Sequence, residues 1–187
     1  MEIHVIRHTP VAVQKGICYG QLDVDVADTF VDDVAKISIQ LDTDYDTIFC
    51  SPLSRCQKLS KALHLEGVRL DKRLMEFDYG DWEGKKWEDI PQEKLQPWMD
   101  DFVNQKTPNG ESLRDIFHRV EEFITTLRAA GYKKVLLVTH GGVIRCLWAS
   151  ILEMPLQNLF KVPVGFHEKF IFNLGTTKEL DGIIRKG

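Results

Sequence analysis

The sequence predicts an α/β fold, a three-layer α/β/α arrangement in which helices cover both faces of a mostly parallel central sheet. Two observations support this prediction. Short β-branched runs alternate along the chain with longer segments whose apolar residues recur at helical spacing. The first run, residues 2–7, is also apolar on both faces, which is typical of a central buried strand. Because no linker, repeat or low-complexity tract interrupts the chain, we expect residues 1–187 to form a single domain.

The first half of the chain continues this alternation. Apolar residues recur at helical spacing over 26–41, and residues 46–50 are the second expected strand. We expect the next helix to open at Ser51 and Pro52, with the serine as its cap and the proline at its first position. Residues 68–70 are the third expected strand.

The second half contains the strongest signals. Residues 71–109 carry three prolines and three of the four tryptophans, and we expect an irregular functional loop or lid there. An amphipathic helix is expected over 113–127, with Gly131 as its stop. The clearest strand, 134–139, leads through His-Gly-Gly into another helix, and 168–174 is a late strand.

Composition excludes several classes of protein. No apolar run approaches the ~18 residues of a membrane span, and the net charge of −4 gives no reason to expect nucleic acid or an anionic membrane as a partner. The N-terminus does not resemble a signal peptide, so we expect a cytoplasmic protein. None of the four cysteines has the spacing of a zinc ligand, which favours buried thiols in a reduced compartment.

Residues whose side chains can take part in catalysis or bind an anion follow four of the expected strands. They lie at 7–8, 51–55, 76 and 140–142, and they include two arginines, two histidines and one glutamate. In a parallel sheet, ligands bind beyond the carboxyl ends of the strands, so these residues are expected to converge at one edge. Each alone has a structural interpretation, such as an arginine that pairs with a carboxylate. Together they favour a chemical role.

These residue types suit a phosphate group. Arginine matches phosphate oxygens bidentately, and helix N-termini add backbone N–H donors. Gly141 and Gly142 would let the backbone approach an oxyanion without a Cβ in the way. A neutral imidazole is a competent nucleophile, and a carboxylic acid opposite it can protonate a leaving group.

Five motifs carry a resemblance to a known family. They occupy residues 5–9 (VIRHT), 50–57 (CSPLSRCQ), 74–84 (LMEFDYGDWEG), 109–113 (NGESL) and 138–145 (VTHGGVIR). In this order they resemble the histidine phosphatase superfamily, also called phosphoglycerate-mutase-like. The resemblance implies that His8 attacks phosphorus and becomes phosphohistidine, and that Glu76 protonates the departing alcohol and later activates water. It also implies that the phosphoryl oxygens are held by Arg7, Arg55 and His140, without a metal or other cofactor.

Supporting contacts and departures are also visible. Gln21 and Ser112 are expected to make further substrate contacts, together with the backbone at Gly141. Thr9 stands where the family often has glycine, and Asn109 replaces the first glycine of a Gly-Gly-Glu-Ser pattern. Neither departure removes a catalytic group.

Within the superfamily, residues 18–24, 77–87 and 140–145 resemble the α-ribazole phosphatases of the late cobalamin pathway. A broad-specificity phosphatase shares much of this pattern. A mutase with the same phosphohistidine chemistry is disfavoured because that branch is longer. A non-catalytic phospho-ligand binder would not need Glu76, and a metal-binding module lacks ligand spacing. The expected partner is a small phosphorylated metabolite, and the sequence allows a homodimer without requiring one.

The remaining tryptophans and histidines have structural interpretations. Packing of the long loop is favoured over stacking on a substrate base for Trp82, Trp87 and Trp98. Structural or surface positions are expected for His4, His64, His118 and His167.

Overall fold

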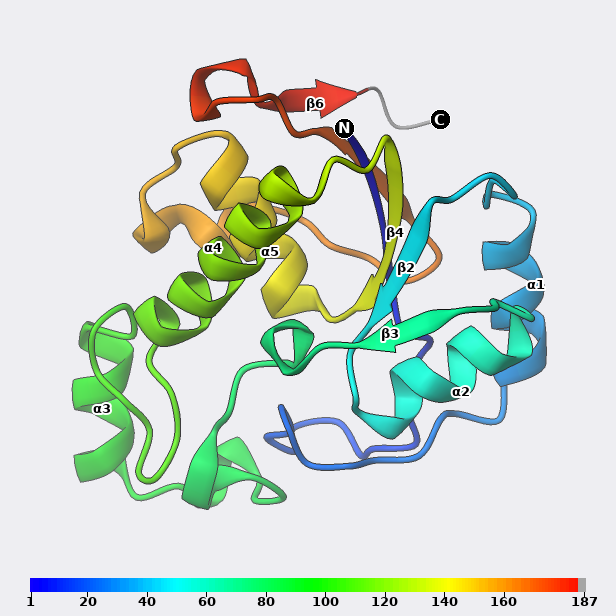
Figure 1. The fold of residues 1–187 in the computed structure, drawn as a ribbon. Coiled ribbons are helices and arrows are strands. Elements are labelled where there is room, and N and C mark those ends of the chain that lie inside the picture. Colours follow the sequence, from blue (N-terminus) through cyan, green and yellow to red (C-terminus); the bar gives the residue numbers. More distant parts are fainter. Residues whose placement is uncertain (185–187) are drawn as a thin grey trace.

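The computed structural model describes residues 1–184. Its core is one six-stranded sheet with the strand order β3-β2-β4-β1-β5-β6 (Figure 1). Four strands run parallel: β1 (Glu2–Arg7), β2 (Thr47–Cys50), β3 (Val68–Leu70) and β4 (Lys134–Thr139). The strand β5 (Lys169–Asn173) is antiparallel to β1, and β6 (Gly182–Ile184) is antiparallel to β5. The prediction of a mostly parallel sheet is confirmed.

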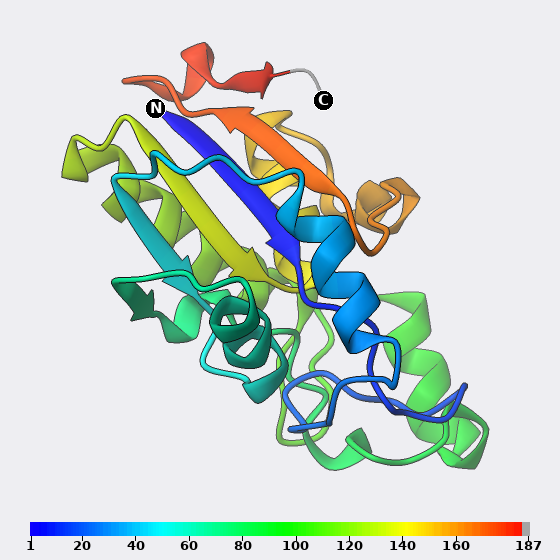
Figure 2. The same cartoon turned by 90° about the vertical axis from the view of Figure 1, so that its right-hand side faces the viewer.

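Helices cover both faces of this sheet, as Figures 1 and 2 show. One face carries α1 (Phe30–Ser38) and α2 (Ser54–Ala62), and the other carries α4 (Leu113–Ala130) and α5 (Gly141–Ile151). Successive residues of a strand face opposite sides. Leu136 and Val138 therefore pack in the core with α1 and α2, whereas Val135 and Leu137 pack with α4 and α5. This explains why the strands are apolar on both faces, and it confirms the three-layer arrangement.

Two helices begin later than the sequence predicts. α1 begins at Phe30 because Val26 instead forms an isolated bridge with Val11. α2 begins at Ser54, so the prediction that Ser51 caps it was wrong. Its N-cap is Leu53, whose backbone is extended. Ser51 lies two residues before this cap, and its hydroxyl instead accepts from the backbone N–H of Leu53 at 3.3 Å.

The segment 71–109 is more regular than expected. It holds three short 3₁₀ turns, Lys72–Leu74, Gly80–Trp82 and Trp87–Asp89, and the α-helix α3 (Gln92–Asp100). Pro97 lies inside α3, which is the reason that the sequence pattern disfavoured a helix. Side-chain hydrogen bonds at i,i+4 spacing, from Gln92 to Gln96 and from Gln96 to Asp100, support this largely exposed helix. The strand β6 was also not predicted.

The three tryptophans of this segment pack against one another. The rings of Trp87 and Trp98 stack with centroids 5.9 Å apart, and the rings of Trp82 and Trp98 meet edge-on at 5.6 Å. Cys18 and Ile90 complete this buried cluster. The packing interpretation is therefore supported, because these rings fix the long segment to the domain.

The other predicted structural positions agree with the structure. Gly131 ends α4 with φ +75°, a conformation that favours glycine. All four cysteines are buried thiols. His118 is exposed, and buried His4 lies 3.0 Å from the hydroxyl of Tyr45. Within residues 1–184, no helix is long and apolar enough to cross a membrane.

Candidate active site

The carboxyl ends of the parallel strands place the predicted residues side by side. Arg7 pairs with Thr139 at the ends of β1 and β4, and the backbone N–H of His8 donates to the carbonyl of Thr139. The N–H of Ser51 donates to Val138 on the other side of β4. The chain segments that carry His8, Ser51 and His140 therefore leave the sheet next to one another, as the strand pattern predicts.

His8 is held as a neutral imidazole with one nitrogen available. Its ring is 1% exposed, and Nδ1 lies 2.7 Å from the carbonyl oxygen of Thr9. A carbonyl can only accept, so Nδ1 carries the proton and Nε2 keeps its lone pair. Burial lowers the pKa of His8 well below its ordinary value, and the charges of Arg55 and Arg7 lower it further. The histidine is therefore unprotonated at neutral pH, as a nucleophile must be.

His140 lies beside His8, with ring centroids 5.1 Å apart. Its Nδ1 accepts a hydrogen bond from Nε of Arg55 at 3.3 Å, so its Nε2 carries the proton and donates to the hydroxyl of Ser51 at 2.7 Å. Burial lowers the pKa of His140 well below its ordinary value, with further lowering by His8 and by the arginines. Both ring nitrogens already have protein partners in this structure.

Arg55 connects the central cluster to the loop that follows β1. Its guanidinium is fully buried and donates to the carbonyl oxygens of Gly20 and Leu22. The same loop is held by Glu83, which accepts from the backbone N–H groups of Gly20, Gln21 and Leu22 at 2.8 to 3.1 Å. The carboxylate therefore orders a loop that in turn orients a buried cation.

Arg7 borders the site on the side of the 163–168 segment. Its Nη1 donates to the carbonyl of Val164 at 3.0 Å, and Cζ lies 3.9 Å from the ring centroid of Phe166. Burial lowers the pKa of Arg7, with Glu76 opposing this effect. Within residues 1–184, Nε of Arg7 and the hydroxyl of Thr9 are buried polar atoms without a hydrogen-bond partner. Such atoms are rare in folded proteins, and these two keep their hydrogen-bonding capacity for a polar ligand at this edge of the sheet.

Glu76 enters the site from the segment after β3. Both of its carboxylate oxygens lie 3.1 Å from the backbone nitrogen of Gly142, and Oε1 also accepts from the N–H of Phe77 at 3.0 Å. A Cβ on Gly142 would lie 2.2 Å from Oε1. Glycine is therefore required at position 142 for this contact, because any side chain would displace the carboxylate.

The backbone of Glu76 is fixed by two further side chains. Nη2 of Arg119 and Nε2 of Gln21 donate to its carbonyl oxygen at 2.9 and 3.0 Å. Arg119 also forms a bidentate pair with Glu111. The position of the Glu76 carboxylate therefore depends on these contacts to the backbone of Glu76 as well as on the hydrogen bonds of the carboxylate itself.

The three predicted supporting residues are placed in different ways. The amide of Gln21 donates to the Glu76 backbone. Ser112 is the N-cap of α4 and exchanges hydrogen bonds with Asp115 in a capping box. A Cβ on Gly141 would lie 3.1 Å from Nη1 of Arg145 and 3.4 Å from Cζ of Arg7. Their predicted contacts with substrate stay predictions.

Sequence reasoning missed several contacts of the site. It did not predict the contacts of Ser51 with His140 or of Gly142 with Glu76, nor the roles of Glu83, Arg119, Arg145 and Phe166. Ser51, Glu83, Gly142 and Arg145 lie inside the recognised motifs, so their positions could have pointed to them. Arg119 lies next to the buried apolar face of its helix, between Ile116 and Val120, which could have suggested that its guanidinium packs against the domain. Nothing in the pattern around Phe166 indicates that its ring faces Arg7.

A small cavity adjoins the carboxylate of Glu76. Its volume is about 90 Å³, and Glu76, Gly142 and Arg145 contribute to its wall. The rest of the lining is aromatic or apolar: Tyr19, Phe77, Tyr79, Leu113, Ile116, Leu159 and Phe160. The tryptophan cluster does not line this cavity. An alcohol bonded to a phosphoryl group at His8 could extend into it.

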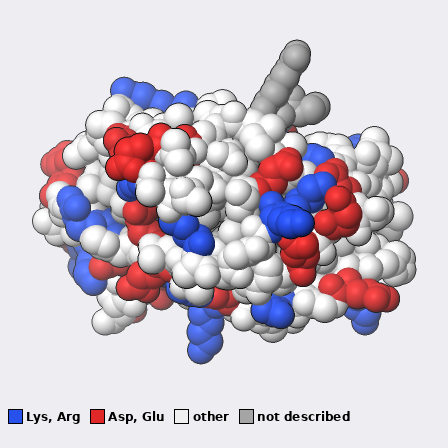
Figure 3. All heavy atoms as spheres, turned by 45° about the horizontal axis from the view of Figure 1, so that its top comes forward, with Lys and Arg blue, Asp and Glu red and all other residues white. Residues whose placement is uncertain are grey.

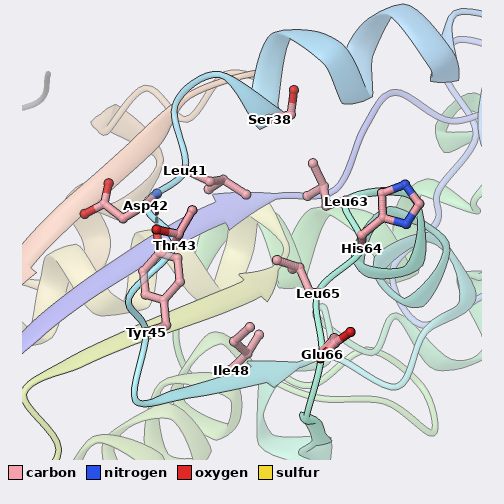
Figure 4. Close-up of a pocket in the computed structure, with 10 residues that line it drawn as sticks. All are labelled: Ser38, Leu41, Asp42, Thr43, Tyr45, Ile48, Leu63, His64, Leu65 and Glu66. Atoms are coloured by element: carbon pink, nitrogen blue, oxygen red, sulfur yellow. Dashed lines mark hydrogen bonds between the residues drawn. The ribbon is translucent and has the colours of Figure 1, made fainter.

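A larger cavity, about 410 Å³, lies away from this site (Figure 4). It is formed by residues that follow α1 and α2 and precede β2 and β3, at the opposite edge of the sheet. Leu41, Leu63 and Leu65 point into it beside Tyr45. It lacks the arginines and paired histidines that phosphate chemistry needs. The smaller cavity beside Glu76 is therefore the better candidate for a substrate site.

The surface near this opposite edge carries both signs of charge, which Figure 3 shows intermixed. Asp42 pairs with Lys134 at 2.9 Å and with Lys169 at 3.2 Å.

In the part of the chain that the structure describes, no group of three or more His, Cys, Asp or Glu side chains is placed to hold a metal ion.

Comparisons with known proteins agree with this geometry. The model of the histidine phosphatase superfamily (branch 1) matches residues 3–176. A putative phosphoserine phosphatase 2 of Hydrogenobacter thermophilus is 28% identical over 168 residues, which is 86% of this chain and 83% of that protein. An adenosylcobalamin/alpha-ribazole phosphatase of Salmonella typhimurium is 33% identical over 131 residues, 65% of this chain and 64% of the relative. That match thus spans less than two thirds of the relative's length.

A solved structure shows the same fold. The crystal structure of the alpha-ribazole phosphatase from Shigella flexneri superimposes with a TM-score of 0.90 at 24% identity, covering 100% of this chain and 96% of the other. The family match spans nearly the whole chain and includes all five motifs. The chain therefore belongs to the histidine phosphatase superfamily (branch 1), and it is a phosphoric monoester hydrolase.

Proposed function

We propose that this enzyme dephosphorylates α-ribazole 5′-phosphate to α-ribazole in cobalamin biosynthesis, without a metal and through a phosphohistidine at His8. The observation that carries the mechanism is the environment of His8. A buried, neutral imidazole presents an unprotonated Nε2 among two guanidinium groups, near the carboxylate of Glu76. A binding module would need the cations but would have no use for the acid.

The proposed reaction has two steps. In the first, Nε2 of His8 forms a bond to phosphorus as the ester P–O bond breaks, and Glu76, which enters this step protonated, gives its proton to the departing alcohol oxygen and becomes a carboxylate. In the second, Glu76 takes a proton from water as the water oxygen bonds to phosphorus and the N–P bond breaks. Inorganic phosphate leaves, and His8 and Glu76 return to their starting states.

The cationic residues stabilise the charge that develops on the phosphoryl oxygens. Arg7 is suited to this role because its buried Nε has no protein partner among residues 1–184. Arg55 uses three N–H groups on protein acceptors and keeps two of its five for a ligand. His140 would contact a phosphoryl oxygen directly only if that contact replaced its hydrogen bond with Arg55 or its hydrogen bond with Ser51.

The substrate assignment is supported by the α-ribazole phosphatase relatives and by the aromatic lining of the cavity, since Tyr19, Phe77, Tyr79 and Phe160 offer faces to a flat base. A second candidate is an ester of a hydroxy acid such as phosphoserine. The relative named as a phosphoserine phosphatase favours it, because that match covers more of the chain.

The test is kcat/KM for α-ribazole 5′-phosphate in the presence of EDTA, beside phosphoserine and a panel of sugar and aryl phosphates. We expect the first value to exceed all others and to be insensitive to EDTA. A higher value for phosphoserine would transfer the assignment to the second candidate. Loss of turnover in EDTA, restored by a divalent cation, would contradict the metal-independent mechanism.

A further inference from the structure

Arg145 stands between the phosphoryl site and the cavity beside Glu76. It lies one helical turn after Gly141 on α5, and helical side chains lean toward the helix N-terminus. Its Nη1 accordingly reaches within 3.1 Å of the place where a Cβ on Gly141 would lie, and Cζ of Arg7 is 3.4 Å from the same point. Two guanidinium groups therefore meet over Gly141, but only Arg145 lines the cavity.

The partners of Arg145 leave most of its donors unused. Among residues 1–184 its one hydrogen bond runs from Nε to the carbonyl of Val162, at 3.1 Å, and it forms no ion pair. The side chain is half-buried, with Cζ 6.0 Å from the ring centroid of Phe160. A guanidinium has five N–H donors, so four remain for a ligand. A partly desolvated cation without a carboxylate partner favours an anionic or strongly accepting group.

The cavity limits where such a group can lie. Glu76, the proposed proton donor to the ester oxygen, and Arg145 both line a space of about 90 Å³. Because Glu76 lines this cavity, the part of the alcohol nearest the ester oxygen lies within reach of its lining residues. The remaining walls are largely aromatic or aliphatic, so Arg145 is the cation available to that part of the substrate.

We propose that Arg145 is a specificity-determining residue that binds an acceptor oxygen of the leaving alcohol, close to the ester oxygen. This rests on the proposed function. A carboxylate or a sugar oxygen would supply the same chemistry, and both would be recognised by charge-assisted hydrogen bonds. Esters of plain hydrocarbon alcohols would gain nothing from Arg145.

Three esters separate these sources: 3-phosphoglycerate carries a carboxylate, ribose 5-phosphate carries neutral sugar oxygens, and cyclopentylmethyl phosphate carries neither. We would measure kcat and KM for each with the unmodified enzyme, Arg145→Gln and Arg145→Lys. Arg69→Gln is the matched control, since Arg69 is an exposed arginine bonded to Tyr132.

We expect Arg145→Gln to lower kcat/KM for at least one oxygenated ester by about 10- to 100-fold more than for cyclopentylmethyl phosphate, mainly through KM. Arg145→Lys should recover part of the loss for a carboxylate. The ester with the larger loss identifies the source. Equal losses on all three esters would overturn the proposal and place Arg145 on the phosphoryl group or in the fold. No loss on any ester would also overturn it.

Dissociation constants measured by calorimetry in a His8→Ala background separate this proposal from the mechanism. If His8→Ala still hydrolyses the esters, the phosphohistidine mechanism fails, yet the ratio of dissociation constants with and without Arg145→Gln still reports on the subsite. If His8→Ala binds all three esters without any dependence on Arg145, the subsite fails and the mechanism stands.

Discussion

Substitution of Gly142 by alanine should separate catalysis from folding. Gly142 lies in the first turn of α5, where alanine is the more favourable residue by about 1 kcal/mol. The added Cβ would lie 2.2 Å from Oε1 of Glu76 and 3.4 Å from Cδ1 of Ile116. The contact with Ile116 is ordinary. The contact with Glu76 is impossible, but the end of a glutamate side chain can move away at little cost to stability.

The size of the effect follows from this displacement. Oε1 must move about 1.2 Å to extend 2.2 Å to an ordinary contact of 3.4 Å, and a misplacement of about 1 Å can cost 10²-fold in rate. General acid catalysis contributes about 10²- to 10⁴-fold, and only where the leaving group needs a proton. We therefore expect kcat/KM to fall about 10²-fold for alkyl phosphates and less than about tenfold for p-nitrophenyl phosphate.

The assay is a series of phosphate esters graded by leaving-group pKa, with the melting temperature recorded for each variant. Glu76→Gln should show the same dependence on leaving group, and adding Gly142→Ala to it should cost little more, because both act on one proton transfer. Gly182→Ala is the control, since a Cβ there meets no atom of residues 1–184 within 4 Å. An equal loss for all leaving groups, or full additivity with Glu76→Gln, would refute the reasoning.

Three further predictions concern the phosphoryl site, the buried histidines and the tryptophan cluster. Thr9→Val removes a buried hydroxyl that has no hydrogen-bond partner in residues 1–184. We expect about tenfold weaker inhibition by inorganic phosphate with no loss of melting temperature. An unchanged inhibition constant would exclude a contact between this hydroxyl and phosphate. His4, His8 and His140 all have pKa values lowered by burial, so the unfolded chain binds more protons than the folded chain once the pH falls below about 6.5. The free energy of unfolding, measured with urea, should therefore decrease from pH 7.5 to pH 5.5 by up to about 1.4 kcal/mol per pH unit for each histidine; a flat profile would contradict the stated burial. Trp98→Leu should lower the free energy of unfolding by about 2–4 kcal/mol and leave KM for α-ribazole 5′-phosphate unchanged, whereas a raised KM at full stability would make Trp98 a substrate contact.

The mostly parallel sheet and the convergence of the site were accessible from sequence because they depend on simple rules. Runs such as 134–139 are apolar on both faces, so they must be central strands, and the polar residues directly after them must meet at one edge. Arg7, His8, Arg55 and His140 were found in this way. The same rule placed Glu76 after the third expected strand, 68–70, and the motifs then implied its role as proton donor.

The positioning contacts could not be predicted because they depend on the paths of loops. Arg119 donates to the Glu76 carbonyl from a helix that lies 43 positions away in sequence. Glu83 binds a loop about 60 positions earlier in the chain. Helix α3 was missed because Pro97 outweighs the weak signal of its glutamines. These features arise from tertiary packing, which overrides local propensity.

The most direct test of the account is the identity of the phosphorylated residue during turnover. The enzyme is mixed with ³²P-labelled substrate, quenched within milliseconds in denaturant at alkaline pH, where phosphohistidine survives, and digested for peptide mapping. We predict a label that is acid-labile, located on His8 and absent from His8→Ala, which should also lose turnover. An unlabelled enzyme under these conditions, or a His8→Ala variant with normal activity, would contradict the proposed mechanism.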